Sequence, residues 1–314
     1  KLNAAFYAPF MLDLFDSDYG FVTPPRPFIP GMDAIGTIDA LGEGVDGLKI
    51  GARVYVDVYC EGGGEPGTDD RCFIGNFAVG ADSESVLARW PNGVFAEYIV
   101  APADCAVPIP SAVKASDADL TRLGWLGTAY AAAMNAGVRP GAVWAVNGAT
   151  GVLGASAVAV ARALEARKIY VFGRRREVLE SLCAIDPRIE AARPGETDPI
   201  DLAVTAMEGD DPASIEAVLG GLARGGRLVA VSSAPLKPRI SLDMLVYGEN
   251  AVLGSLWFDR HRQLPDLFDL LADGRLDLSP FKPRTFPLSS IDKASDAVAA
   301  RPGGLEHIVI NCQE

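Results

Sequence analysis

Short apolar runs alternate with Gly, Pro and polar turn residues over the first part of the chain, up to about residue 112. Three of these runs have a β-type composition, and they cover residues 34–38, 53–58 and 95–100. A turn over residues 45–52 leads into the second run. Short β-type runs separated by turn residues predict a small β domain.

From about residue 115 the pattern changes to alternating helices and strands. A helical stretch over residues 118–135, with a break near Gly124, precedes an apolar strand over residues 143–146. A Gly-rich turn, an Ala-rich helix over residues 152–166 and a second strand over residues 168–172 follow. This order, with uniformly apolar strands, predicts a parallel sheet covered by helices.

The later elements continue the alternation, except at one place. The run 200–204 is the best candidate for the strand that should precede the helix 213–219, but a run this short could also form a helical turn. The remaining predicted strands cover residues 227–231, 251–256, 285–286 and 307–310, and the remaining helices cover residues 264–272 and 291–300.

Composition narrows the class of protein. The 314 residues, 49% of them hydrophobic, suffice for two domains with their own cores. The net charge of −13 argues against a nucleic-acid-binding surface. No apolar run is long enough to cross a membrane, and the start lacks the order of a signal peptide. Because residues 1–5 read as part of a strand, we expect that further residues precede them. Five widely spaced cysteines favour a reducing, cytoplasmic location over a disulfide framework.

The strongest motif is the Gly-rich turn over residues 147–154, which lies directly between an apolar strand and a helix. Gly151 would allow a pyrophosphate to come close to the backbone, and Gly154 would allow tight packing of the helix. The helix start offers free N–H groups to phosphates. Ala149 stands where the common G-x-G-x-x-G pattern has its first glycine, so a plain glycine turn is the alternative. The expected cofactor contacts at this turn are Asn147, Ala149, Thr150, Gly151, Val152 and Leu153.

The end of the second strand indicates which dinucleotide is bound. Enzymes that use NAD usually place an acid here for the ribose 2′-OH, whereas the first acid in this chain is Glu177. Gly173 is followed instead by Arg174, Arg175 and a third arginine, which can bind a 2′-phosphate. A solvated basic helix start is the alternative, although cations oppose the dipole at that end of a helix. The pattern favours NADP(H).

Together with this turn, three segments resemble the medium-chain dehydrogenase/reductase superfamily: residues 27–38, 93–98 and 126–130. The resemblance implies an α/β fold in two domains. A GroES-like β domain would comprise residues 1–122 and be completed by residues 259–314, around a Rossmann doubly wound domain over residues 123–258. The nicotinamide would lie in the cleft between them. The resemblance also implies cofactor contacts at Thr128, Ser232, Ser233 and Leu256.

The same resemblance implies that this chain lacks a catalytic zinc. Zinc-containing relatives use a Cys in the first β segment, the His of a Gly-His-Glu motif and a Cys before the nucleotide domain. Here residues 4–11 and 123–127 contain no Cys, and Met32 occupies the His position. The two histidines, His261 and His307, lie far along the chain. Cys60 and Cys72 lie in a loop that resembles the structural-zinc lobe, but without a C-x-x-C, so we interpret it as a metal-free remnant that shapes the substrate cleft or a subunit contact.

Without a metal, a hydrogen-bond donor must polarise the substrate carbonyl while the cofactor supplies the hydride. Tyr7 is the first candidate for a catalytic residue, and Asp13 and Asp33 are weaker ones. A structural role is favoured for Asp33. The resemblance implies an apolar substrate pocket, although core packing would account for at least half of these side chains: Phe6, Phe10, Met11, Trp125, Trp257 and Phe258.

The sequence therefore predicts an NADPH-dependent oxidoreductase that reduces a ketone, aldehyde, enone or quinone. A zinc-independent quinone reductase and a non-catalytic NADPH-binding protein are the alternatives. By resemblance we expect a homodimer, with residues 251–256 as the edge strand of its interface, and no nucleic-acid or membrane partner.

Overall fold

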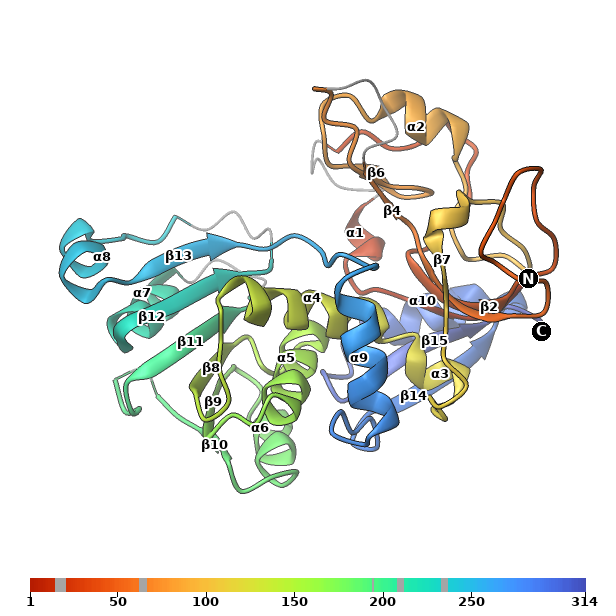
Figure 1. The fold of residues 1–314 in the computed structure, drawn as a ribbon. Coiled ribbons are helices and arrows are strands. Elements are labelled where there is room, and N and C mark those ends of the chain that lie inside the picture. Colours follow the sequence, from red (N-terminus) through yellow and green to blue (C-terminus); the bar gives the residue numbers. More distant parts are fainter. Residues whose placement is uncertain (15–20, 62–66, 194, 208–211, 233–236) are drawn as a thin grey trace. The chain divides into compact units, whose positions relative to one another are not determined.

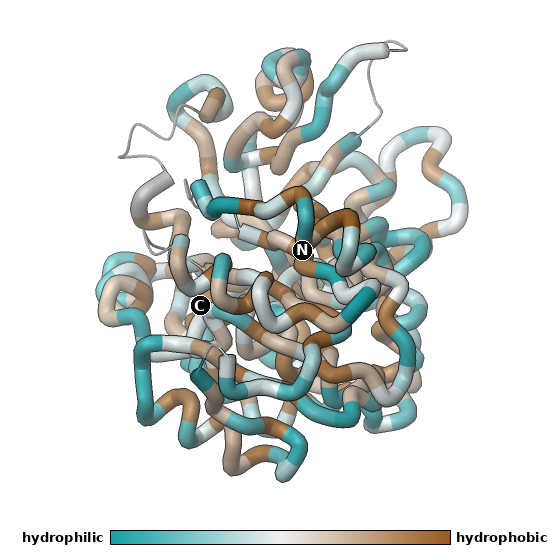
Figure 2. Tube along the Cα trace, turned by 90° about the vertical axis from the view of Figure 1, so that its left-hand side faces the viewer, coloured by the Kyte–Doolittle hydropathy of each residue, from teal (hydrophilic) through white to brown (hydrophobic). Residues whose placement is uncertain are grey.

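The computed structural model describes residues 1–14, 21–61, 67–193, 195–207, 212–232 and 237–314, which form two compact units (Figure 1). Unit 1 comprises residues 1–123, 282–302 and 306–314, and unit 2 comprises residues 124–281 and 303–305. The chain begins and ends in unit 1, where the first and last strands pair and the two termini lie close together (Figures 1 and 2).

Unit 1 contains a six-stranded sheet in the order β14-β15-β1-β2-β3-β7. Its pairs are antiparallel except for β14 and β15, which are parallel. The predicted strands over residues 34–38, 53–58, 285–286 and 307–310 are confirmed to within a few residues. The bounds are β1 (Leu2–Phe6), β2 (Asp33–Thr37), β3 (Arg53–Asp57), β7 (Ala106–Pro108), β14 (Lys282–Pro287) and β15 (Glu306–Asn311).

Smaller elements complete unit 1. A three-stranded sheet consists of β4 (Tyr59–Cys60), β5 (Cys72–Phe73) and β6 (Phe77–Ala78). The helices are α1 (Met11–Leu14), α2 (Glu84–Arg89), α3 (Asp117–Leu120) and α10 (Ile291–Ala299), with 3-10 turns η1 (Ala103–Cys105) and η2 (Leu288–Ser290).

The strand predicted over residues 95–100 is wrong. This segment bends and bonds to two different parts of the chain: the Phe95 N–H donates to the Pro30 carbonyl at 3.0 Å, and the Glu97 carbonyl accepts from the Leu2 N–H at 2.8 Å. Because no single neighbour runs alongside it in register, no strand forms, although its β-type residues are typical of one.

Unit 2 is built on a six-stranded sheet in the order β10-β9-β8-β11-β12-β13, in which every pair is parallel. The ambiguous run 200–204 is confirmed as a strand. It forms β11, which pairs with β8 on one side and β12 on the other, whereas a helical turn would leave those two strand edges without partners. The bounds are β8 (Val143–Asn147), β9 (Lys168–Phe172), β10 (Ile189–Ala191), β11 (Ile200–Thr205), β12 (Leu222–Ala230) and β13 (Ala251–Gly254).

Helices flank this sheet, and α5 is one of the two that are mostly buried, together with α4. The alanines of α5 let the helix approach the strands closely, so that most of its residues are buried. Within the described ranges, none of the helices is both long and apolar enough to cross a membrane. The bounds are α4 (Leu123–Asn135), α5 (Val152–Ala163), α6 (Arg176–Cys183), α7 (Pro212–Gly220), α8 (Leu242–Gly248) and α9 (Gln263–Ala272).

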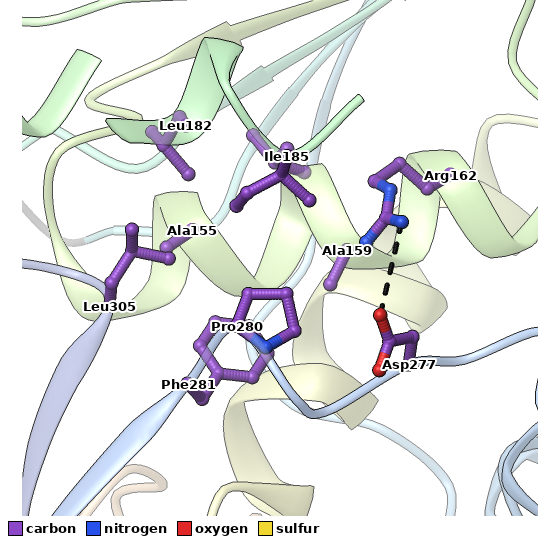
Figure 3. Close-up of a pocket in the computed structure, with 10 residues that line it drawn as sticks. Ala155, Ala159, Arg162, Leu182, Ile185, Asp277, Pro280, Phe281 and Leu305 are labelled. Atoms are coloured by element: carbon purple, nitrogen blue, oxygen red, sulfur yellow. Dashed lines mark ion pairs between the residues drawn. The ribbon is translucent and has the colours of Figure 1, made fainter. Parts of the chain in front are cut away.

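Residues 259–281, which the sequence analysis assigned to the β domain, belong to unit 2. The Tyr130 hydroxyl of α4 donates to Asp266 of α9 at 2.9 Å. Pro280 and Phe281 lie against α5 around a cavity of about 10 Å³ (Figure 3), room for about one water and far too small for a cofactor. The hydrogen bond to α4 and the apolar contacts with α5 explain why the boundary between the two units falls after Phe281.

Candidate functional site

Two glycines give the turn between β8 and α5 its shape. Gly148 has a φ of +84°, and a Cβ there would lie 2.7 Å from the Ala206 carbonyl oxygen. A Cβ on Gly154 would lie 2.2 Å from the Gly148 carbonyl oxygen. Gly151, at the N-cap of α5, would keep a Cβ 3.5 Å from its nearest neighbour. Packing thus requires Gly148 and Gly154, whereas Gly151 leaves open space over the turn.

The backbone of this turn offers donors to an anion. The N–H groups of Gly148 and Ala149 both donate to the Phe172 carbonyl of β9, at 3.0 and 2.9 Å. In the described part of the chain, the N–H groups of Leu153 and Gly154 have no backbone acceptor, as is usual in the first turn of a helix. Those groups and the positive end of the helix dipole favour a phosphate at this position.

The sheet order places this turn beside a topological switch point, because the chain proceeds outwards in opposite directions from β8 and β11. In open α/β sheets ligands bind there, at the carboxyl ends of the strands. Asn147 and Thr205, the last residues of these two strands, are register partners and are 2% and 3% exposed. The Asn147 Oδ1 accepts from the Ser214 hydroxyl at 3.1 Å. Among the described residues, the Asn147 Nδ2 and the Thr205 Oγ1 have no hydrogen-bond partner.

The arginines after β9 have three different environments. Arg175 donates from its guanidinium to the Thr150 carbonyl, which anchors the turn. Arg176 pairs with Glu180 one helical turn further on, at 2.9 Å. Arg174 is exposed and, within the described ranges, has no ion-pair partner. The sequence analysis treated Arg174 and Arg175 alike, whereas the structure leaves Arg174 as the more accessible charge.

Gly173 is a close contact of the same turn. A Cβ on Gly173 would lie 2.6 Å from the Thr150 Cγ2, so a larger residue would push the end of β9 away from the turn. Thr150 itself is 7% exposed, and its carbonyl accepts a hydrogen bond from Arg175. Gly173 therefore contributes by its small size.

Gly304 is a part of the site that the sequence analysis missed. Its N–H donates to the Thr150 carbonyl at 2.9 Å, and a Cβ there would lie 2.2 Å from the Gly151 carbonyl oxygen. The only signal in the sequence was the Gly303-Gly304 pair, about 150 residues after the motif. Its close approach to the turn is a tertiary contact that no local pattern indicates.

The other cofactor contacts expected in unit 2 have mixed environments. The Thr128 hydroxyl is buried and donates to the Gly124 carbonyl within α4 at 2.9 Å. The Ser232 hydroxyl donates to the Met207 carbonyl at 2.7 Å, which joins the loops after β11 and β12. Leu256 is exposed. Ser233 lies outside the described residues. Cofactor contacts at these positions stay predictions.

Three of the aromatic residues expected in the pocket lie in unit 2: Trp257 and Phe258 follow β13, and Trp125 lies in α4. The Trp257 ring packs 5.0 Å from the buried Phe258 ring. A Cβ on Gly127 would lie 2.4 Å from the Phe258 ring, so Phe258 rests directly on α4. Trp125, also on α4, is half-buried.

The candidate residues described in unit 1 are either buried or half-buried. Phe6 is buried and its ring stacks on His307 at 5.6 Å, which suits the core-packing alternative. Met11 is also buried. Tyr7 is half-buried, with its ring 5.0 Å from Phe95. Phe10 is half-buried, with its ring edge-on to Phe77 at 6.2 Å. Asp13 lies in α1, and its side chain is outside the described parts.

Asp33 is a completely buried acid at the start of β2. Burial raises the pKa of Asp33 to about 8; the hydrogen bond from the Tyr55 hydroxyl opposes this, and the nearby Asp57 adds to it. Among the described residues, the Asp33 Oδ2 has no hydrogen-bond partner. Asp33 is therefore protonated at neutral pH, which suits the structural role that the sequence favoured.

His307 is also a core residue. Its Nε2 lies 3.2 Å from the Ala118 carbonyl oxygen. Burial, and then the charge of the buried Arg122, lower the pKa of His307 to about 3, so the ring is neutral. Within the described ranges, no three His, Cys, Asp or Glu side chains are grouped so that they could hold a metal ion.

Comparison with known proteins agrees with this architecture. Residues 11–111 match the family model of the alcohol dehydrogenase GroES-like domain. Over 271 residues the chain is 29% identical to sorbitol dehydrogenase of Bacillus subtilis, which covers 80% of this chain and 72% of the relative. It is 26% identical to L-threonine 3-dehydrogenase of Escherichia fergusonii, over 90% of this chain and 82% of the relative.

A solved structure extends the likeness to the whole fold. The cobalt- and zinc-bound thermostable alcohol dehydrogenase of Pyrobaculum aerophilum superposes with a TM-score of 0.78 at 26% identity, covering 99% of this chain and 89% of that one. The α/β fold is thus confirmed as a GroES-like domain with a Rossmann-like parallel-sheet domain. The chain is thus similar to dehydrogenases, and one segment of it matches the alcohol dehydrogenase GroES-like domain.

Proposed function

We propose that this protein is an NADPH-dependent reductase of a small ketone, aldehyde, enone or quinone that works without a catalytic zinc. The observation that carries the proposal is the turn between β8 and α5, where Gly148 and Gly154 are tightly packed and Gly151 leaves open space. The exposed Arg174 lies just after β9. When bound, NADPH would supply the hydride. The chain would hold its pyrophosphate at the Gly151 turn and at the start of α5.

The preference for NADPH rests on the charges after β9. Arg174 is exposed and can bind a 2′-phosphate through two N–H groups. Arg175 acts on the site through the Thr150 carbonyl, so its role is to position the turn. The first acid after β9 is Glu177, two residues after Arg175 and already in α6. A 2′-phosphate at the end of β9 would therefore lie closer in sequence to the arginines than to an acid.

The residues present do not fit a catalytic zinc. Such a site needs about three N, S or O ligands from the protein. By the resemblance, Met32 replaces the histidine of zinc-containing relatives, and its thioether is a poor zinc ligand. His307 is buried against Phe6 and the Ala118 carbonyl. The Pyrobaculum aerophilum relative binds cobalt and zinc, and this chain would differ from it at the ligand positions.

In the absence of a metal ion, Tyr7 is the proposed donor to the substrate oxygen, and its hydroxyl proton would be delivered to that atom as the hydride arrives. The half-buried rings of Trp125 and Trp257 are proposed to line an apolar pocket of unit 2, and Phe10 is kept as a candidate pocket residue of unit 1. Asp13 is kept as a weaker candidate, and Asp33 as a structural acid.

We also propose a homodimer formed through β13, an edge strand of the unit 2 sheet that presents the exposed Val252. We propose the reducing cytoplasm as its location, which suits five cysteines in the thiol form: Cys60, Cys72, Cys105, Cys183 and Cys312.

The test is NADPH oxidation with a panel of ketones, aldehydes, enones and quinones, on protein whose metal content has been measured. We expect turnover with at least one class at a zinc content far below one ion per chain. Turnover confined to quinones would favour the quinone reductase. Tight NADPH binding without any turnover would favour the non-catalytic alternative, and a zinc ion in every chain would refute the metal-free mechanism.

A further inference from the structure

Two thiols far apart in the sequence meet in unit 1. The Sγ of Cys60, at the end of β4, lies 3.6 Å from the Sγ of Cys105, at the end of η1. A third thiol, Cys72 on β5, belongs to the residue paired with Cys60 across the small sheet. No local pattern indicates this contact, because 45 positions separate Cys60 from Cys105.

We infer that Cys60 and Cys105 form a reversible, peroxide-sensitive dithiol–disulfide pair. A disulfide requires an S–S distance of about 2.05 Å, so the two sulfurs must approach by about 1.5 Å. Rotation of the two side chains and small shifts of the backbone can supply that movement. Cys60 ends a two-residue strand and Cys105 ends a three-residue turn, and neither lies within a long, rigid element.

Accessibility assigns the roles of the two thiols. Cys60 is half-buried and can meet a small oxidant, whereas Cys105 is completely buried. The Cys60 thiolate attacks hydrogen peroxide, so that an S–O bond forms, the O–O bond breaks and water leaves. Cys105 then attacks the sulfur of this sulfenic acid, the S–S bond forms, and the second oxygen leaves as water. The two thiols lose two electrons and two protons in total, and one peroxide becomes two waters.

Cys72 is less suited to the second step. Cys105 is the thiol whose Sγ lies 3.6 Å from that of Cys60, whereas Cys72 is paired with Cys60 through the small sheet. A metal site is also less suitable, because no three potential ligands are grouped in the described part of the chain. The geometry therefore favours oxidation of one specific pair.

The bond would join two parts of unit 1. Cys60 belongs to the three-stranded sheet, whereas Cys105 directly precedes β7, which pairs with β3 of the six-stranded sheet. Oxidation would thus fix the small sheet to the edge of the large one. This redox pair does not depend on the proposed reductase activity.

Trypsin offers a direct test, because it separates the three thiols into three peptides: residues 54–71, 72–89 and 90–114. The full chain, fully reduced, is treated with hydrogen peroxide and digested without reductant. We expect a cross-link between the first and third peptides, loss of two of the five thiols, and full reversal by dithiothreitol.

Variants complete the test. Cys105→Ser should abolish the cross-link and leave a sulfenic acid on Cys60 that dimedone traps. Cys60→Ser should also abolish the cross-link, but no sulfenic acid should be trapped at Cys105, because the thiol that reacts with peroxide is gone. Cys183→Ser, a change in α6 of unit 2, should leave it unchanged. If Cys105→Ser fails to fold, Cys60→Ser at its half-buried position still tests the pair. A link between the first two peptides, or oxidation of Cys183 with no cross-link, would overturn the inference.

Discussion

Replacement of Gly154 by alanine tests whether the turn between β8 and α5 requires the close contact seen in the structure. The new Cβ would lie 2.2 Å from the Gly148 carbonyl oxygen and 2.7 Å from the Ala149 Cα. Ordinary contacts between such atoms are about 3.5 Å, so the turn must move by about 1 Å.

The magnitude follows from two opposing effects. Overpacking of this kind costs about 1–3 kcal/mol. Alanine has a higher helix propensity than glycine, worth up to about 1 kcal/mol within a helix, and less in the first turn, where Gly154 lies. We therefore expect the free energy of unfolding to fall by about 1–2 kcal/mol. The affinity for NADPH should fall as well, because the displaced turn no longer presents its N–H groups to the pyrophosphate.

Denaturant unfolding and NADPH titration measure the two effects. Gly220→Ala is the matched control, because no atom lies within 4 Å of the added Cβ. Gly151→Ala separates the two effects, since its Cβ has room in the protein but would stand where the pyrophosphate is proposed to lie. If Gly154→Ala is as stable as the wild type and binds NADPH equally well, the contact is not what shapes the turn.

Three further predictions concern the cofactor, a buried acid and the oligomer. Arg174→Asp should weaken NADPH binding by about 10- to 100-fold, as expected for the loss of a charge-assisted hydrogen bond worth about 1.5–3 kcal/mol, and leave NADH nearly unchanged. Calorimetry measures both affinities, with Arg176→Asp as the control, because the Arg176 side chain already pairs with Glu180. If Arg174→Asp weakens NADPH and NADH binding equally, the assignment of Arg174 to the 2′-phosphate is contradicted. Because burial raises the pKa of Asp33 to about 8 from the usual 3.8, the folded state binds the proton more tightly, so this contribution to stability is complete below about pH 4 and is lost as the pH rises through 8. Asp33→Asn should flatten the decline of unfolding free energy between about pH 4 and about pH 8, and a decline as steep as in the wild type would show that Asp33 is not its source. Val252→Lys on the edge strand β13 should convert a dimer into monomers in sedimentation experiments, and an unchanged mass would place the interface elsewhere.

Much of unit 2 could be predicted from the sequence because its signals are local. The turn over residues 147–154 lies between a strand and a helix within one short stretch, and Gly154 there is explained by Gly148 and Ala149, only a few residues away. The arginines after β9 were also visible, but not that Arg175 bonds the Thr150 carbonyl while Arg174 stays exposed. Their difference depends on how β9 lies against the turn.

The sequence by itself determined the alternation of strands and helices around the glycine turn, the turn itself and, by the resemblance, the absence of Cys and His from the positions of the zinc ligands. Only the tertiary structure decided that residues 95–100 do not form a strand, that residues 259–281 pack on α4 and α5, that Gly304 closes over the turn and that Cys60 meets Cys105. Periodicity and motif spacing report on neighbours within about one element, whereas these four features depend on contacts between residues distant in the chain, which packing alone brings together.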